Sequence, residues 1–163
     1  MKYKIIDNFL DKKDFDDIKN LLMGFDFPWY YQPEITDEGE TGPNKSFYFF
    51  HLFFKNLEVR SNLYANMFPL LNKLEVISLI RAKANFYPNQ NKFIEHKFHT
   101  DFPYKHKGCL FYINTNNGFT ILKDGTKIES VENRALLFDP SVIHKSTNCT
   151  DERSRININI NYF

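Results

Sequence analysis

The chain has 163 residues, of which 21 are basic and 20 acidic, so its formal net charge at pH 7 is +1. That length suits a single domain with a sizeable core, and the balanced charge argues against nucleic acid as a partner. The cysteines are too few for a disulfide framework, the first residues lack the apolar run of a signal peptide, and no segment reaches the roughly 20 apolar residues of a membrane span. We therefore expect a cytoplasmic protein that does not enter a membrane.

The first 75 residues are expected to form a region of helices and strands that supports a later barrel. Its expected elements are a strand over residues 3–6, a helix from the N-cap Asp11 to Gly24, a strand over 47–54 and a helix within 58–71. Pro69 should kink or shorten the second helix. Residues 34–44 are rich in glycine and acidic residues, and they form either a lid over a site or a plain connection.

Residues 76–163 are expected to form the barrel core, because their apolar residues recur with a period of two. The expected strands cover residues 76–87, 94–99, 108–114, 118–122, 126–131, 135–138, 142–147 and 153–162. The dipeptide Asp124-Gly125 favours a type I′ hairpin turn. Short strands at intervals of about 8 to 12 residues indicate an all-β barrel or sandwich. We expect the N-terminal helices to cover one outer face of its larger sheet.

A histidine and an aspartate two residues apart, His99 and Asp101, are candidate metal ligands. On an extended backbone, residues two apart point the same way, so the imidazole and the carboxylate can converge on one point. A distant third ligand, for which His144 is available, would complete a set of two histidines and one carboxylate. This ligand set suits Fe(II) and leaves coordination positions open.

The last predicted strand has one apolar face and one polar face. Its isoleucines alternate with polar residues, which are Arg155, Asn157, Asn159 and Asn161. The apolar face must be buried, so the polar face looks either to solvent or into a wet barrel interior. If it looks inward beside His144, Arg155 offers a fork of donors suited to binding a carboxylate.

Four segments together resemble the Fe(II)/2-oxoglutarate-dependent dioxygenases: Asn85-Phe86-Tyr87-Pro88, His99-Thr100-Asp101, the segment 138–144 that ends in His144, and Arg155-Ile156-Asn157. Their order and spacing are similar to the family's pattern of His-x-Asp, a distal histidine and a basic residue about ten positions further on. The opening segment Ile6-Asp7-Asn8-Phe9-Leu10 also resembles the small prolyl-hydroxylase-like branch. The resemblance implies a double-stranded β-helix, or jelly roll, over the whole chain.

The resemblance also implies the chemistry of the site. Fe(II) would be held by His99, Asp101 and His144, with 2-oxoglutarate and O₂ taking the open positions. The reaction would hydroxylate a substrate and release succinate and CO₂. A protein or peptide residue, prolyl first, is the favoured substrate, and a small molecule remains open.

The cosubstrate residues follow from the same resemblance. Arg155 would bind the far carboxylate of 2-oxoglutarate, and Tyr87, Asn85 and Asn157 would line its pocket. Collagen-type prolyl hydroxylases place a lysine where this chain offers an arginine. Arg153 lies at a similar spacing, but Arg155 should already be inside the strand, so we prefer Arg155.

Two other functions remain open at this point: a non-enzymatic jelly-roll binding module, and a cupin-like metalloenzyme that does not use 2-oxoglutarate. The remaining histidines have structural interpretations. We expect His96 to be structural or at the surface, His106 to be solvated in a loop, and His51 to be a hydrogen-bonded core residue. Cys109 should be a small buried residue rather than a nucleophile.

Overall fold

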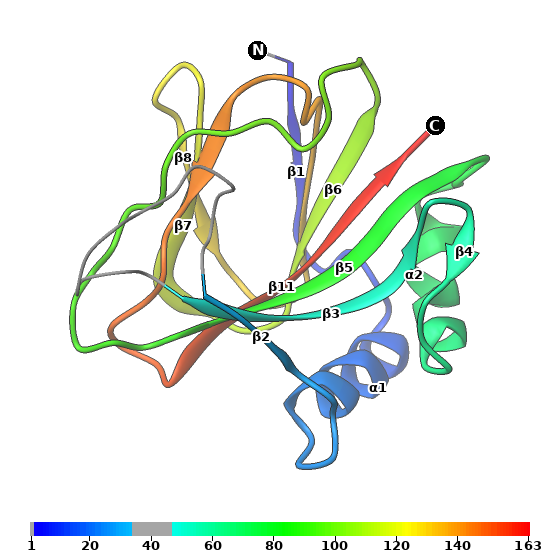
Figure 1. Cartoon of the computed structure of the whole chain (residues 1–163), viewed down its shortest axis with the longest axis horizontal. Helices are drawn as coiled ribbons and strands as arrows, with labels where there is room; N and C mark the ends of the chain where they lie inside the picture. The colour runs from blue at the N-terminus through cyan, green and yellow to red at the C-terminus, as the bar shows by residue number, and fades with distance from the viewer. Residues whose placement is uncertain (1, 34–46) are drawn as a thin grey trace.

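A computed structural model describes residues 2–33 and 47–163 (Figure 1), so the predicted loop at 34–44 lies outside the described residues. The first part contains β1 (Lys4–Ile6), α1 (Lys12–Met23), β2 (Tyr30–Gln32), β3 (Tyr48–Lys55), β4 (Glu58–Val59), a 3₁₀ turn (Tyr64–Met67) and α2 (Phe68–Lys73). The second contains β5 (Leu79–Pro88), β6 (Lys107–Tyr112), β7 (Asn116–Leu122), β8 (Lys127–Ser130), β9 (Arg134–Phe138), β10 (His144–Ser146) and β11 (Ser154–Tyr162). The prediction of a mainly β fold is confirmed.

The strands form two antiparallel sheets. The larger sheet has the order β1-β9-β6-β11-β5-β3-β2, with β4 also paired to β3, and the smaller sheet has the order β10-β7-β8. In Figure 1, α1 and α2 lie on the side of the larger sheet that is away from β7 and β8. Neither helix in the described part of the chain has the length and apolar character needed to cross a membrane.

The main hydrophobic core lies between the helices and the larger sheet. Phe15 of α1 packs edge-on against Phe111 of β6, with ring centroids 6.1 Å apart. Leu70 of α2 belongs to the same buried cluster as the three isoleucines of β11. A smaller apolar cluster on the other side of the larger sheet joins it to β7 and β8; its members are Leu110, Tyr112, Leu122, Ile128, Leu136 and Phe138.

The inner face of β5 and β11 is polar along its whole length. The two strands pair antiparallel, and this pairing places four residues of β5 opposite four of β11: Arg81 with Asn161, Lys83 with Asn159, Asn85 with Asn157, and Tyr87 with Arg155. We call these eight residues the polar ladder. Because side chains alternate between the faces of a strand, the isoleucines of β11 enter the main core while the ladder faces the space between the sheets.

The second helix lies later in the chain than predicted. Residues 58–59 form β4, which pairs with the end of β3, and α2 begins only at Phe68. Pro69 therefore occupies the first turn of α2. In the first turn the missing N–H of proline removes no helical hydrogen bond, so Pro69 begins this helix instead of kinking it.

Two of the predicted strands also differ from the structure. Residues 94–99 form no continuous ladder, and only two isolated bridges join them to the chain around β10: Glu95 to Thr147 and His99 to His144. The strand expected from residue 76 begins at Leu79, because Ile77 and Ser78 instead donate their backbone N–H groups to the carbonyl of Phe163.

The hairpin between β7 and β8 uses a different turn from the one predicted. Gly125 donates its N–H to the carbonyl of Leu122 at 2.9 Å, and within this turn only Gly125 has a positive φ, of 85°. A type I′ turn needs positive φ at both central residues, so that prediction was wrong. Lys123 and Asp124 instead form the centre of a type I turn, and Gly125 follows in the left-handed region.

Asn133 ties the turn between β8 and β9 to the start of α1. Its side chain accepts from the Leu10 N–H and donates to the Leu10 carbonyl, both at 2.9 Å, and its φ is 56°. We predict that Asn133→Ala lowers the free energy of unfolding by roughly 2 to 3 kcal/mol, because two buried backbone groups lose their partners. Urea denaturation measures the loss. Asn56→Ala, at an exposed position with the same φ, is the control for the effect of replacing asparagine at a positive φ. An equal loss of stability in both variants would contradict the role of the Asn133 side chain in holding Leu10.

Candidate metal centre and adjoining pocket

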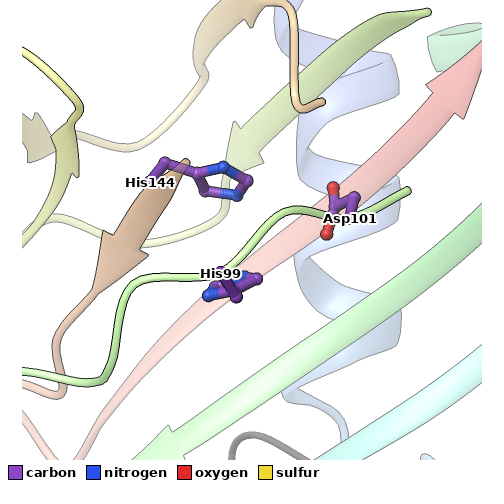
Figure 2. A group of neighbouring side chains, drawn as sticks. All are labelled: His99, Asp101 and His144. Carbon is purple, nitrogen blue, oxygen red and sulfur yellow. The ribbon is translucent and has the colours of Figure 1, made fainter. Parts of the chain in front are cut away.

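The structure brings His99, Asp101 and His144 together. Their candidate ligand atoms all lie within 4.8 Å of one another. His99 and His144 form an antiparallel bridge with reciprocal backbone hydrogen bonds of 2.9 Å, and their ring centroids are 4.6 Å apart. Figure 2 shows the three side chains on two neighbouring segments, one carrying His99 and Asp101 and the other being β10. The irregular chain around residue 99 thus supplies two of the three groups.

Both histidines of this triad are oriented by backbone carbonyls. The Nδ1 atom of His99 lies 3.3 Å from the Lys97 carbonyl, and that of His144 lies 3.0 Å from the Val142 carbonyl. A carbonyl can only accept, so Nδ1 carries the proton in each ring and Nε2 keeps its lone pair for a metal. Burial, and then the neighbouring His144, lower the pKa of His99, which favours the neutral ligand form.

Asp101 is held in its ionised form by three side chains of the polar ladder. Arg81 Nη2 lies 2.8 Å from Oδ1, while the side-chain amides of Asn159 and Asn161 donate to Oδ2 at 3.0 and 2.9 Å. Burial by itself would raise the pKa of Asp101, but the Arg81 charge and the amide donors hold it well below its ordinary value. The carboxylate is therefore ionised, as a metal ligand must be.

His106 extends this network and is not the solvated loop residue that we expected. Its side chain is buried, and its Nε2 accepts from the amide of Asn161 at 3.1 Å. Its Nδ1 donates to the Tyr104 carbonyl at 2.8 Å. The segment after Asp101 folds back over the end of β11, which removes His106 from water and makes it a partner of the residue that holds Asp101.

The other two histidines lie outside the triad. His51 is the hydrogen-bonded core residue that we predicted, with ring nitrogens 2.8 Å from the Pro28 carbonyl and 2.7 Å from Ser61 Oγ. His96 is buried against the ring of Tyr87, with centroids 5.0 Å apart. Neither of its ring nitrogens has a hydrogen-bond partner among the described residues.

Arg155 is fully buried in the space between the two sheets. Its Nε donates to Ser130 Oγ at 2.7 Å, its Nη2 donates to Thr120 Oγ1 at 3.1 Å, and its Nη1 donates to Ser146 Oγ. Its guanidinium also lies over the rings of Tyr87 and Tyr112. Among the described residues no carboxylate pairs with it, so its charge has only neutral partners. Arg153 is exposed, so only Arg155 enters the interior.

The strand opposite Arg155 is fitted to its long side chain. A Cβ atom built on Gly118 would lie 2.5 Å from Cδ of Arg155, which no real contact tolerates. β7 therefore has a glycine where the stem of the arginine crosses it. Burial of the guanidinium lowers the pKa of Arg155, yet arginine stays charged in proteins.

A narrow cavity of about 30 Å³ joins the histidines to the surroundings of Arg155. Its lining includes His99 and His144 at one end and Thr120 and Ser146, both partners of Arg155, at the other. The remaining polar residues of its lining are Asn85, Tyr87, Asn157 and Asn159.

Two buried polar atoms in this cavity have no partner. The amide of Asn85 donates to Asn157 Oδ1 at 3.0 Å, and this bond leaves Asn85 Oδ1 and Asn157 Nδ2 unpaired among the described residues. Buried polar groups are almost always hydrogen-bonded, so an unpaired acceptor and an unpaired donor side by side fit a polar occupant of this cavity.

Five of the seven predicted site residues line this cavity: Asn85, Tyr87, His99, His144 and Asn157. Asp101 completes the triad with the two histidines, and Arg155 donates to Thr120 and Ser146 of the lining. The sequence interpretation assigned no role to several of their supporting residues: Arg81, His106, Thr120, Ser130, Ser146, Asn159 and Asn161. A signal for three of them was present, because Arg81, Asn159 and Asn161 share the strand alternation of Asn85 and Asn157. The signal could not be used without the register that pairs β5 with β11.

No family model matches this sequence, and no curated protein matches it in sequence. Several solved structures match the structure of this chain. A prolyl hydroxylase from Trichoplax adhaerens, solved with a hypoxia inducible factor peptide fragment, superposes with a TM-score of 0.70 at 13% identity, over 99% of this chain and 83% of that one. A 2OG-Fe(II) oxygenase family oxidoreductase from Burkholderia pseudomallei gives 0.73 at 11% identity, over 98% and 84%.

A third solved structure, the viral collagen prolyl hydroxylase of Paramecium Bursaria Chlorella virus-1 in its 2-oxoglutarate complex, has a TM-score of 0.59 at 15% identity, covering 99% of this chain and 95% of that one. Identities of this size establish a shared fold and no more. The comparisons confirm the predicted jelly roll: the chain has the fold of the Fe(II)/2-oxoglutarate oxygenases.

Proposed function

We propose that this protein is an Fe(II)- and 2-oxoglutarate-dependent dioxygenase that hydroxylates its substrate with release of succinate and CO₂. The observation that carries the proposal is the fully buried Arg155, which has only neutral partners among the described residues. Two of these partners, Thr120 and Ser146, line the same cavity as His99 and His144. A buried charge without a counter-charge is costly, so this position fits an anion bound from outside the chain.

The triad fits Fe(II) by its chemistry. Two imidazoles whose Nδ1 atoms face backbone carbonyls, together with one ionised carboxylate, form a ligand set that suits Fe(II) in oxygenases. Because three protein ligands leave coordination positions open, a cosubstrate and O₂ can reach the same metal. The iron, when bound with 2-oxoglutarate and O₂, would oxidise a substrate C–H bond to C–OH, with the second oxygen atom entering succinate.

The groups around the cavity suit the two ends of 2-oxoglutarate in charge and in hydrogen bonding. Arg155 would pair with the far carboxylate, and the 2-oxo acid end would face His99 and His144. The unpaired Asn157 Nδ2 would donate to an oxygen of the bound cosubstrate. The chain's own contribution is to neutralise, orient and desolvate this dianion.

The two other functions suggested by the sequence account for less of the site. A non-enzymatic jelly-roll module needs neither the triad nor an arginine inside the barrel. A cupin-like enzyme without 2-oxoglutarate uses the triad but leaves the buried charge of Arg155 without a role. A peptide residue, prolyl first, is supported as substrate by the sequence resemblance and by the peptide bound to the Trichoplax enzyme.

The proposal is tested by following succinate release from 2-oxoglutarate by the Fe(II)-loaded protein in air. We predict slow release without any substrate and no release from His99→Ala. Arg155→Met should raise the KM for 2-oxoglutarate about 100-fold, because charge-assisted hydrogen bonds of roughly 1.5 to 3 kcal/mol are lost. Arg153→Met is the matched control and should behave like the wild type. A larger effect from Arg153→Met, or no succinate from folded wild-type protein, would overturn the proposal.

The Asp101 network should contribute to metal affinity. We predict that Asn161→Ala weakens Mn(II) or Fe(II) binding by about 10- to 100-fold, as losses of outer-sphere partners do, because Asp101 loses a donor and Arg81 loses an acceptor. Competition against a metal-binding dye measures the affinity. Asn72→Ala, at an exposed position in α2, is the control. Equal affinity in Asn161→Ala and the wild type would show that Asp101 is positioned without this network.

A further inference from the structure

A second, larger cavity of about 410 Å³ opens beside the triad, and His99 lines both this cavity and the narrow one. Asp101 also belongs to the lining of the larger cavity. Its main wall is the inner face of β3 and β5, where Leu52 pairs with Lys83 and Lys55 pairs with Arg81. A volume of this size suits a small molecule or one amino-acid side chain with its neighbours. We call this cavity the cleft.

Among the described residues, the lining of the cleft carries more positive than negative charge. These residues include three cations, Lys55, Arg81 and Lys83, and one acid, the metal-ligand candidate Asp101, which pairs with Arg81. Lys55 is exposed and forms no ion pair within the part of the chain that the structure describes. The nearest acid along its hairpin, Glu58, pairs instead with Arg60 at 2.7 Å.

Aromatic rings give the same wall an apolar part. Tyr48 and Phe50 both line the cleft, with ring centroids 6.3 Å apart. The Lys83 ammonium lies 5.4 Å above the Tyr48 ring and 3.4 Å from its hydroxyl. One wall thus presents a flat apolar surface and two ammonium groups at a short distance from the metal ligands.

We propose that the cleft binds the substrate and that this substrate carries an oxyanion, a carboxylate or a phosphate, beside the carbon that is oxidised. The inference rests on the proposed function, because it places the substrate next to the metal. A cleft lined by charges of one sign focuses its field and concentrates ligands of the opposite sign. Lys55 and Lys83 receive the anion, and Tyr48 and Phe50 pack against the apolar body of the substrate.

The oxyanion can belong to a free acid or to an acidic residue of a peptide, and paired probes distinguish these sources. N-acetylproline has a free carboxylate that N-acetylprolinamide lacks. Acetyl-Glu-Pro-amide has a side-chain carboxylate that acetyl-Gln-Pro-amide lacks. Phenyl phosphate has a phosphate group that phenol lacks. Each member is added to protein loaded with Mn(II) and the unreactive cosubstrate analogue N-oxalylglycine, and binding is measured from the faster relaxation of ligand protons near Mn(II).

We expect the anionic member of at least one pair to bind tenfold or more tightly than its neutral partner, and Lys55→Glu to remove that preference. Lys73→Glu makes the same change of net charge at an exposed position in α2 and should leave the preference intact. If Mn(II) and N-oxalylglycine bind but no pair shows a preference, or if Lys73→Glu abolishes it equally, this inference is overturned and the proposed function stands. If the protein does not bind N-oxalylglycine, the proposed function fails first.

Discussion

A buried positive charge, the guanidinium of Arg155, is the constraint on which the barrel interior depends. Its hydrogen-bond acceptors come from all three strands of the smaller sheet, Thr120 on β7, Ser130 on β8 and Ser146 on β10, while its own strand lies in the larger sheet. The arginine therefore ties the two sheets together by hydrogen bonds. These acceptors are neutral, and no carboxylate of the described residues pairs with Arg155, which is why we propose that an anion binds there.

The polar ladder connects that charge to the rest of the site. Its Arg155 end borders the narrow cavity, while its Arg81 end holds Asp101 and borders the cleft. Under the proposed function, one face of two paired strands would thus supply groups for the cosubstrate, the metal ligand and the substrate in sequence. The opposite face of β11 consists of isoleucines that pack in the main core, so the helices outside the sheet stabilise the strand that carries the site.

The candidate ligands could be identified from the sequence more readily than the residues that support them. His99, Asp101 and Arg155 could be found because strand alternation and spacing along the chain relate them. Asn161 and His106 could not, because their roles arise from pairing between residues about 50 to 80 positions apart, which alternation alone does not specify. Residues 94–99 form no regular strand, yet two isolated bridges suffice to hold His99 against His144.

We propose that the space between the sheets holds a metal at the triad and a carboxylate at Arg155. The most direct test is a crystal structure with Mn(II) and N-oxalylglycine, read from its anomalous difference map and ligand density. We expect a single metal peak shared by His99, Asp101 and His144, with the far carboxylate of the analogue on Arg155. A metal peak elsewhere, or a carboxylate on Lys55 or Lys83 with Arg155 still unpaired, would contradict it.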